Sequence, residues 1–84
     1  MNNERIKEIL LDICPCEIDF SVIQTGKESK RVNGFYQPDT HEIYIHNLNL
    51  KTDNMLIYTA IHEYTHHLCT IEKLENDPSY GKAC

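Results

Sequence analysis

At 84 residues and 9.8 kDa the chain forms one small domain at most, and a chain of this length buries only about 60–65% of its unfolded surface. Its composition, 40% hydrophobic and 25% charged, argues against disorder, and its formal net charge of −5 argues against nucleic-acid binding. No apolar run reaches the length of a membrane span, and residues 1–10 do not resemble a signal peptide. We therefore expect a cytoplasmic protein whose four cysteines are reduced.

An apolar stripe with helical spacing runs through residues 2–13. Asn2 or Asn3 can cap this helix, and Pro15 stops it. The stripe consists of Ile6, Ile9, Leu10 and Ile13.

Two further regions predict strands. Residues 17–23 alternate between apolar and polar side chains, which is typical of a half-buried strand. Residues 31–37 and 41–47 flank the tight connection Pro-Asp-Thr and predict an antiparallel hairpin, with Ile43 and Ile45 on one face. Gly34 in its first arm indicates a bulge or a close backbone approach.

A second helical pattern runs from Thr52 or Asp53, either of which can be the N-cap, to about Glu75. Its predicted packing stripe, facing the first helix, is formed by Ile57, Ile61, Tyr64, Leu68 and Ile71. The polar tail, residues 76–84, has no predicted element. The sequence thus predicts a single α+β domain over residues 1–84: a helix, a small three-stranded and mostly antiparallel sheet, and a last helix.

The stretch IHEYTHHLCT, residues 61–70, places His62 and His66 one helical turn apart, with Glu63 beside the first. Two imidazoles at i and i+4 point the same way and can bind one zinc ion. Zinc lowers the pKa of a bound water to about 7, and Glu63 is placed to accept the proton. Because HExxH also arises by chance, the alternative is a solvent-facing histidine cluster that binds no metal.

The other candidate residues have simpler explanations. A structural or exposed role is expected for the remaining histidines, His41, His46 and His67. The thiols of Cys14 and Cys16 lack the spacing of paired zinc ligands, so we interpret them as incidental, with a structural Cys/His zinc site as the alternative. A solvated turn is expected for the local basic cluster of Lys27, Lys30 and Arg31.

The decapeptide TAIHEYTHHL, residues 59–68, resembles the active-site helix of the zincin metallopeptidases, and the predicted order of elements over residues 4–72 resembles their upper subdomain. Within the zincins the chain looks most like the small SprT-like group, with the minigluzincins as the nearest rival. The resemblance implies a zinc site with His62 and His66 as ligands and Glu63 as general base. It also implies that a peptide substrate pairs along an exposed strand at residues 42–47.

The third zinc ligand is not evident. SprT-like relatives generally carry a further histidine downstream, but no histidine follows His67, so the chain looks like a domain cut short. Glu72 has the metzincin spacing from His62, yet Cys69 stands where those proteins need a glycine. The weak candidates are Glu72, Glu75, Asp77 and Cys84. Tyr80 could steady an oxyanion, although an exposed tail tyrosine is the simpler interpretation.

We therefore expect a zinc-dependent peptidase that hydrolyses peptide bonds with a metal-activated water, or a fragment of such an enzyme. Three alternatives stay open. The domain could bind zinc without catalysis, act as a regulator of toxin–antitoxin or phage type, or be an interaction module whose histidines bind no metal. SprT-like relatives are often linked to proteins on DNA, but the acidic balance of this chain gives no support for a nucleic-acid partner.

Overall fold

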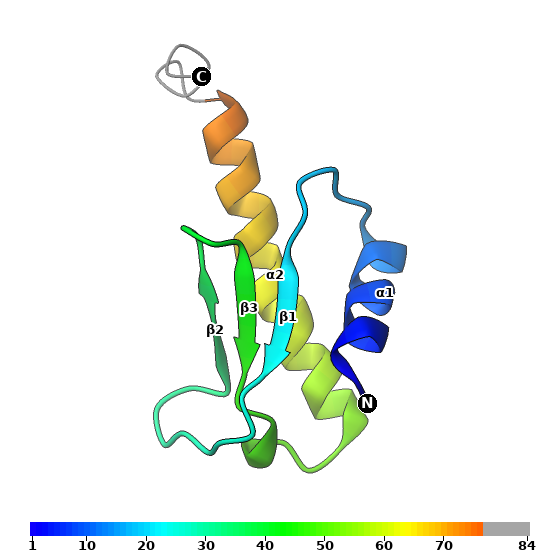
Figure 1. Ribbon diagram of the computed structural model, residues 1–84, viewed down its shortest axis with the longest axis vertical. Coiled ribbons are helices and arrows are strands. Elements are labelled where there is room, and N and C mark those ends of the chain that lie inside the picture. The colour runs from blue at the N-terminus through cyan, green and yellow to red at the C-terminus, as the bar shows by residue number, and fades with distance from the viewer. Residues whose placement is uncertain (77–84) are drawn as a thin grey trace.

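The computed structural model describes the backbone of residues 1–76 and the side chains of residues 1–73. The elements follow one another as α1 (Asn3–Ile13), β1 (Ser21–Gln24), β2 (Gly34–Gln37), β3 (Glu42–Ile45), a short 3-10 helix η1 (Asn47–Asn49) and α2 (Asp53–Asn76), as Figure 1 shows. The predicted α+β class and the order helix, sheet, helix are confirmed.

Helix α1 begins and ends where the sequence indicates. The Asn2 side chain accepts a hydrogen bond from the Arg5 backbone N–H at 2.8 Å, which makes Asn2 the N-cap. The helix stops at Ile13, two residues before Pro15. Ile6 and Leu10 are fully buried, whereas Ile13 is 58% exposed, so only the middle of the predicted stripe packs on the core.

The sheet is mixed rather than mostly antiparallel. Strands β2 and β3 form the predicted antiparallel hairpin, but β1 lies parallel to β3, and the strand order is β1-β3-β2. The reason is the connection at residues 25–33, which is long enough to carry the chain past the place that β3 later takes. Strand β3 is therefore the central strand, and β1 and β2 are the two edges.

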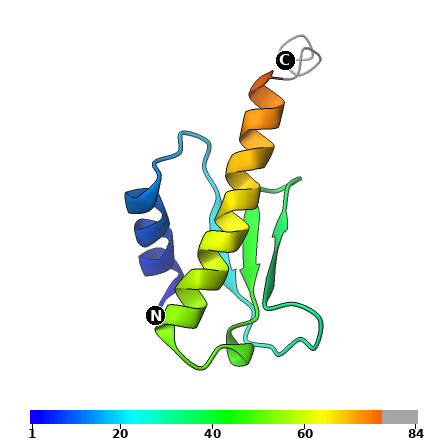
Figure 2. The same cartoon turned by 180° about the vertical axis from the view of Figure 1, so that it is seen from behind.

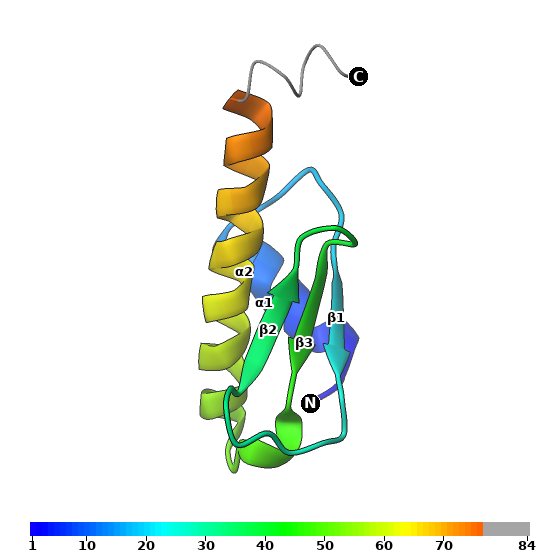
Figure 3. The same ribbon diagram turned by 90° about the vertical axis from the view of Figure 1, so that its left-hand side faces the viewer.

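Both helices cover the same face of the sheet, as the edge-on view of Figure 3 shows, and α2 crosses that face beside α1 in Figure 2. The core between these layers is formed by Ile6, Leu10, Phe20, Val22, Ile43, Ile45, Leu56, Ala60 and Tyr64. On the opposite face of the sheet the rings of Phe35 and Tyr44 stack, with centroids 4.7 Å apart. The predicted inward positions of Ile43 and Ile45 are confirmed.

Helix α2 starts as predicted, because the Thr52 hydroxyl accepts a hydrogen bond from the Met55 backbone N–H at 3.2 Å. The predicted packing stripe is confirmed only in part: Tyr64 is buried, and Ile57 and Leu68 are half-buried against the core, but Ile61 is 37% exposed. The buried positions of the helix are instead Leu56, Thr59, Ala60, Glu63, Tyr64 and His67. Although α2 has 24 residues, neither it nor any other described helix is apolar enough to cross a membrane.

Gly34 explains why α2 turns small and polar residues towards the sheet. A Cβ atom at this buried position would lie 2.5 Å from the Tyr44 carbonyl oxygen and 3.3 Å from the Thr59 Cγ2 atom. The missing side chain therefore permits the helix and β2 to approach closely at Thr59. The close backbone approach expected at Gly34 is confirmed.

We expect Gly34→Ala to lower the free energy of unfolding by about 1–3 kcal/mol, because the new methyl group meets a backbone oxygen that cannot move aside cheaply. Urea denaturation followed by circular dichroism measures the change. The sign is decisive, since removing a glycine from a strand without steric conflict stabilises by roughly 0.5–1 kcal/mol. A Gly34→Ala protein that is more stable than the wild type contradicts the close approach.

Candidate metal centre

His62 and His66 lie on adjacent turns of α2 and point to the same side. Their ring centroids are 5.0 Å apart, the rings are nearly perpendicular at 86°, and both side chains are exposed. Burial of the opposite face of α2 turns them outward, so the predicted pair is brought together as the spacing indicated. Imidazole nitrogens arranged in this way suit zinc, which binds neutral histidine.

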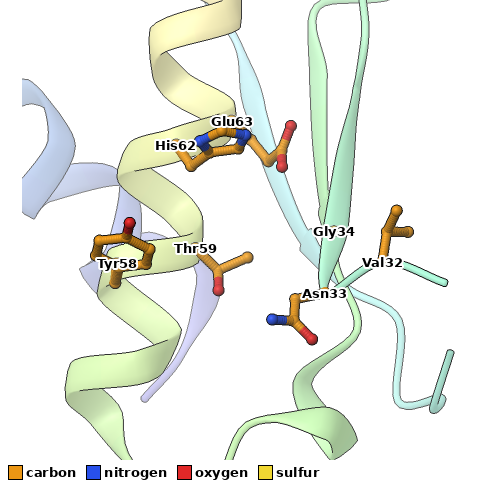
Figure 4. A pocket seen from close by; sticks show the side chains of 7 residues that line it. All are labelled: Val32, Asn33, Gly34, Tyr58, Thr59, His62 and Glu63. Carbon is orange, nitrogen blue, oxygen red and sulfur yellow. The ribbon is translucent and has the colours of Figure 1, made fainter. Parts of the chain in front are cut away.

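A cleft runs between α2 and the edge strand β2, directly beside the pair. It consists of two adjoining hollows of about 310 and 490 Å³ that share His62 and Glu63 on the helix and Val32 and Gly34 on the strand side. The smaller hollow, shown in Figure 4, is completed by Asn33, Tyr58 and Thr59. The larger one is completed by Phe35, Tyr36, Pro38, His66 and Thr70.

Glu63 occupies the boundary between the buried face of α2 and the histidine face. The residue is only 7% exposed, yet it lines both hollows, and Figure 4 shows its carboxylate directed from the helix towards β2. No hydrogen bond or ion pair joins it to another side chain within residues 1–73, and no fully enclosed polar atom there lacks a partner. The carboxylate is therefore free to accept a hydrogen bond from a molecule in the cleft.

The described residues contain no group of three metal-binding side chains. Glu72 lies on the exposed part of α2, and the helix continues past it to Asn76, which carries Glu72 away from the histidine pair. The side chain of Glu75 lies outside the described part of the chain, as do Asp77, Tyr80 and Cys84. A catalytic zinc site needs three protein ligands, and the described residues bring together two candidate side chains, His62 and His66.

His67 is a structural residue and lines neither hollow. Its side chain is fully buried, and its Nε2 atom lies 3.3 Å from the Ile18 carbonyl oxygen, which can only accept. Nε2 therefore carries the proton, and Nδ1 accepts a hydrogen bond from the Tyr36 hydroxyl at 2.6 Å. The Tyr36 oxygen in turn lies 2.9 Å from Nδ1 of His41. Burial lowers the pKa of His67 below its ordinary value.

The remaining predicted positions take no part in the metal centre. His46 lies 2.9 Å from the Thr25 hydroxyl through its Nδ1 atom, at the far end of β3. Cys14, Cys16 and Cys69 are free thiols, and the Cys16 sulfur lies 3.6 Å from Nε2 of His67. Cysteines and histidines form no metal-binding cluster among the residues described.

The expectation that a peptide pairs along an exposed strand at residues 42–47 does not fit the order of the strands. Strand β3 is hydrogen-bonded to β1 on one side and to β2 on the other, so it has no free edge for a further strand. The free edge next to the histidine pair belongs to β2. No local pattern in residues 31–47 indicates this, because only the strand order decides which arm of the hairpin is central.

Sequence reasoning missed Tyr36, the cleft residue that holds His67, and Asn33 in the smaller hollow. The sequence indicated only that Tyr36 belongs to a strand, and no local pattern predicts a hydrogen bond to a residue 31 positions away. Comparison with protein-family models, with curated proteins and with solved structures found no match. The resemblance to zincins therefore rests on the HExxH decapeptide and stays a prediction.

The buried His67 predicts a stability that depends on pH. The folded state keeps this imidazole neutral, whereas the unfolded chain takes up a proton below about pH 6.5. The contribution of His67 is therefore complete above that pH and is lost as the pH falls towards its lowered folded-state pKa, by at most about 1.4 kcal/mol per pH unit. Urea denaturation of metal-free protein from pH 8 to pH 5 measures this slope.

The control is His67→Gln, which removes the titrating group. We expect it to be less stable than the wild type at pH 7 but to lose less stability between pH 7 and pH 5. Parallel profiles for the two proteins contradict the assignment of a neutral His67.

The paired rings predict a stoichiometric zinc site. Since losing a residue that merely orients a ligand costs about 10- to 100-fold in metal affinity, we expect His62→Ala and His66→Ala each to weaken zinc binding at least about 100-fold. Competition with a chromogenic chelator measures the affinity. His46→Ala is the matched control, because its ring bonds to Thr25 and lines neither hollow of the cleft. Equal zinc affinity in all four proteins contradicts the site.

Proposed function

We propose that the chain is a zinc-dependent peptidase domain that hydrolyses peptide bonds in the cleft between α2 and β2. The observation that carries the proposal is the position of Glu63, a carboxylate that is almost buried, has no described side-chain partner and opens onto the same cleft as His62 and His66. A general base has to be fixed in place and to have a free lone pair, and this position meets both conditions.

The residues present fit zinc in part. His62 and His66 would hold the ion, and a third ligand would come from outside the described side chains, where Glu75, Asp77 and Cys84 are the candidates. Zinc, when bound, makes water a nucleophile at neutral pH and polarises a carbonyl group. Glu63 would accept the proton of a water that attacks the peptide carbonyl, and would deliver it to the amine nitrogen as the peptide C–N bond breaks.

The free edge of β2 offers a way to hold the substrate. An extended peptide that pairs with Gly34–Gln37 would run through the cleft, with its backbone hydrogen-bonded to the sheet and its side chains in the two hollows. This arrangement replaces the pairing along residues 42–47 that the resemblance implied. It places a peptide bond within reach of the face that carries His62 and His66.

The absence of a third ligand among the described residues favours a second candidate function, a domain that binds zinc without turnover. Such a domain would use the two histidines and groups from solvent or a partner. The two functions differ in what Glu63 does, because a domain without turnover needs no general base.

We expect Glu63→Gln to keep zinc affinity within about threefold and to lower the rate of peptide hydrolysis by about 10²- to 10⁴-fold, the range for removing a general base. The zinc-loaded proteins are compared on a quenched fluorescent peptide mixture. Glu17→Gln is the control, since it makes the same change at an exposed site away from the cleft. If the Glu63 and Glu17 variants hydrolyse the peptides at the same rate, Glu63 is not the general base. If the wild type hydrolyses no peptide, the second candidate function, zinc binding without turnover, is favoured.

A further inference from the structure

The loop before β2 presents the exposed basic cluster of Lys27, Lys30 and Arg31. With Glu28, residues 27–31 carry three positive charges and one negative, a net charge of +2 in a chain whose net charge is −5. None of the three cations forms an ion pair within the described part of the chain, where the two salt bridges are Arg5–Glu8 and Lys7–Asp19.

This loop is held in place although it has no regular secondary structure. The Gly26 and Ser29 backbone N–H groups donate to the side-chain oxygens of Asn47 and Asn49, at 2.8 and 2.9 Å. The Asn49 amide nitrogen donates back to the Ser29 carbonyl oxygen at 2.6 Å. These bonds attach the loop backbone to the 3-10 helix η1, so the exposed cations are carried by an anchored loop that leads into the cleft at Val32.

The loop runs directly into the smaller hollow through Val32 and Asn33. The Asn33 side-chain oxygen accepts a hydrogen bond from the Asn49 amide at 3.2 Å, which fixes the orientation of the Asn33 amide group. Figure 4 shows its nitrogen on the side of α2, and no described residue accepts a hydrogen bond from it. The hollow therefore contains an oriented N–H₂ donor next to the cationic loop.

We propose that this end of the cleft binds acidic side chains, so that the substrates of the proposed peptidase are peptides with Asp or Glu close to the bond that is cleaved. The inference rests on the proposed function for the cleavage step. The hollow of about 310 Å³ has room for a carboxylate side chain. Because Glu63 lines the same hollow, the acidic side chain has to lie at the Asn33 end, which Figure 4 shows apart from the Glu63 carboxylate. Asn33 donates to the carboxylate there, while Lys30 and Arg31 attract acidic residues further along the peptide.

A peptide fits these observations better than a nucleic acid. The basic cluster is confined to a few residues of an acidic chain, whereas nucleic-acid binding uses a broad basic face. The adjoining strand edge is suited to pair with an extended peptide backbone. A nucleic-acid ligand is one of the outcomes of the test.

The experiment measures binding by fluorescence anisotropy with two labelled peptides of about eight residues, one rich in Glu and one with Gln at the same positions. Metal-free wild-type protein is used, so that binding is read without turnover. An exposed charge pair changes affinity by a factor of about 1.4 to 5. We therefore expect the Glu peptide to bind about 5- to 20-fold more tightly at about 0.05 M salt, and the difference to shrink at about 0.5 M.

Two variants test the residues. Lys30→Glu/Arg31→Glu should remove the preference for the Glu peptide, and Arg5→Glu/Lys73→Glu, which makes the same change in net charge on α1 and late in α2, should keep it. Asn33→Asp keeps the oxygen that Asn49 bonds and replaces only the donor. We expect it to weaken binding of the Glu peptide about 5- to 20-fold and to change binding of the Gln peptide less than about twofold.

An equal loss of preference in the two double variants overturns the inference, because it reduces the effect to net charge. The assignment to peptides is overturned if a single-stranded oligonucleotide binds more tightly than the Glu peptide and if Lys30→Glu/Arg31→Glu abolishes that binding.

Hydrolysis assays on zinc-loaded protein distinguish a failure of this inference from a failure of the proposed function. Hydrolysis without a preference for Glu overturns the inference alone, and selective binding without hydrolysis overturns the peptidase while leaving the acidic-ligand site.

Discussion

The hydrogen bond between His67 and Tyr36 fixes how the last helix lies on the sheet. It joins the fully buried imidazole of α2 to the strand β2 at 2.6 Å, and the Ile18 carbonyl holds the other ring nitrogen. Successive residues of a helix are related by a fixed rotation about its axis, so holding one side chain against the sheet determines where the other side chains point. With His67 buried, His62 and His66 face the cleft and Glu63 falls at its edge.

Burying the His67 ring also costs free energy, and this cost is a large fraction of the stability of a small domain. An enclosed polar ring stabilises the fold only while its hydrogen bonds are complete, because a buried donor or acceptor without a partner costs about 1–3 kcal/mol. Glu63 is nearly buried, but its carboxylate opens onto the cleft, and no fully enclosed side-chain polar atom among the described residues lacks a partner. Packing alone gives no reason for a carboxylate at this position. A bound cation or substrate would supply one, and it would also stabilise the folded state by mass action.

The elements and the histidine pair could be predicted from sequence because they depend on local rules. The cap at Asn2, the stop before Pro15 and the i, i+4 spacing of His62 and His66 are each determined within a few residues. The direction of α2 could not be predicted from apolar periodicity. Its buried face contains Thr59, Glu63 and His67, and these residues are buried because of Gly34 and Tyr36, which lie far away in the sequence.

The strand order is the other feature that local patterns do not contain. The sequence of neither arm of the hairpin shows which one is central, and only the parallel pairing of β1 with β3 leaves β2 at the edge. Strand β2 then serves two purposes at once. Its inward residues, Gly34 and Tyr36, position α2, while its free edge and the preceding Asn33 face the cleft. A change that loosens β2 should therefore disturb the direction of His62 and the binding edge together, so fold stability and the geometry of the candidate site depend on the same four residues of chain.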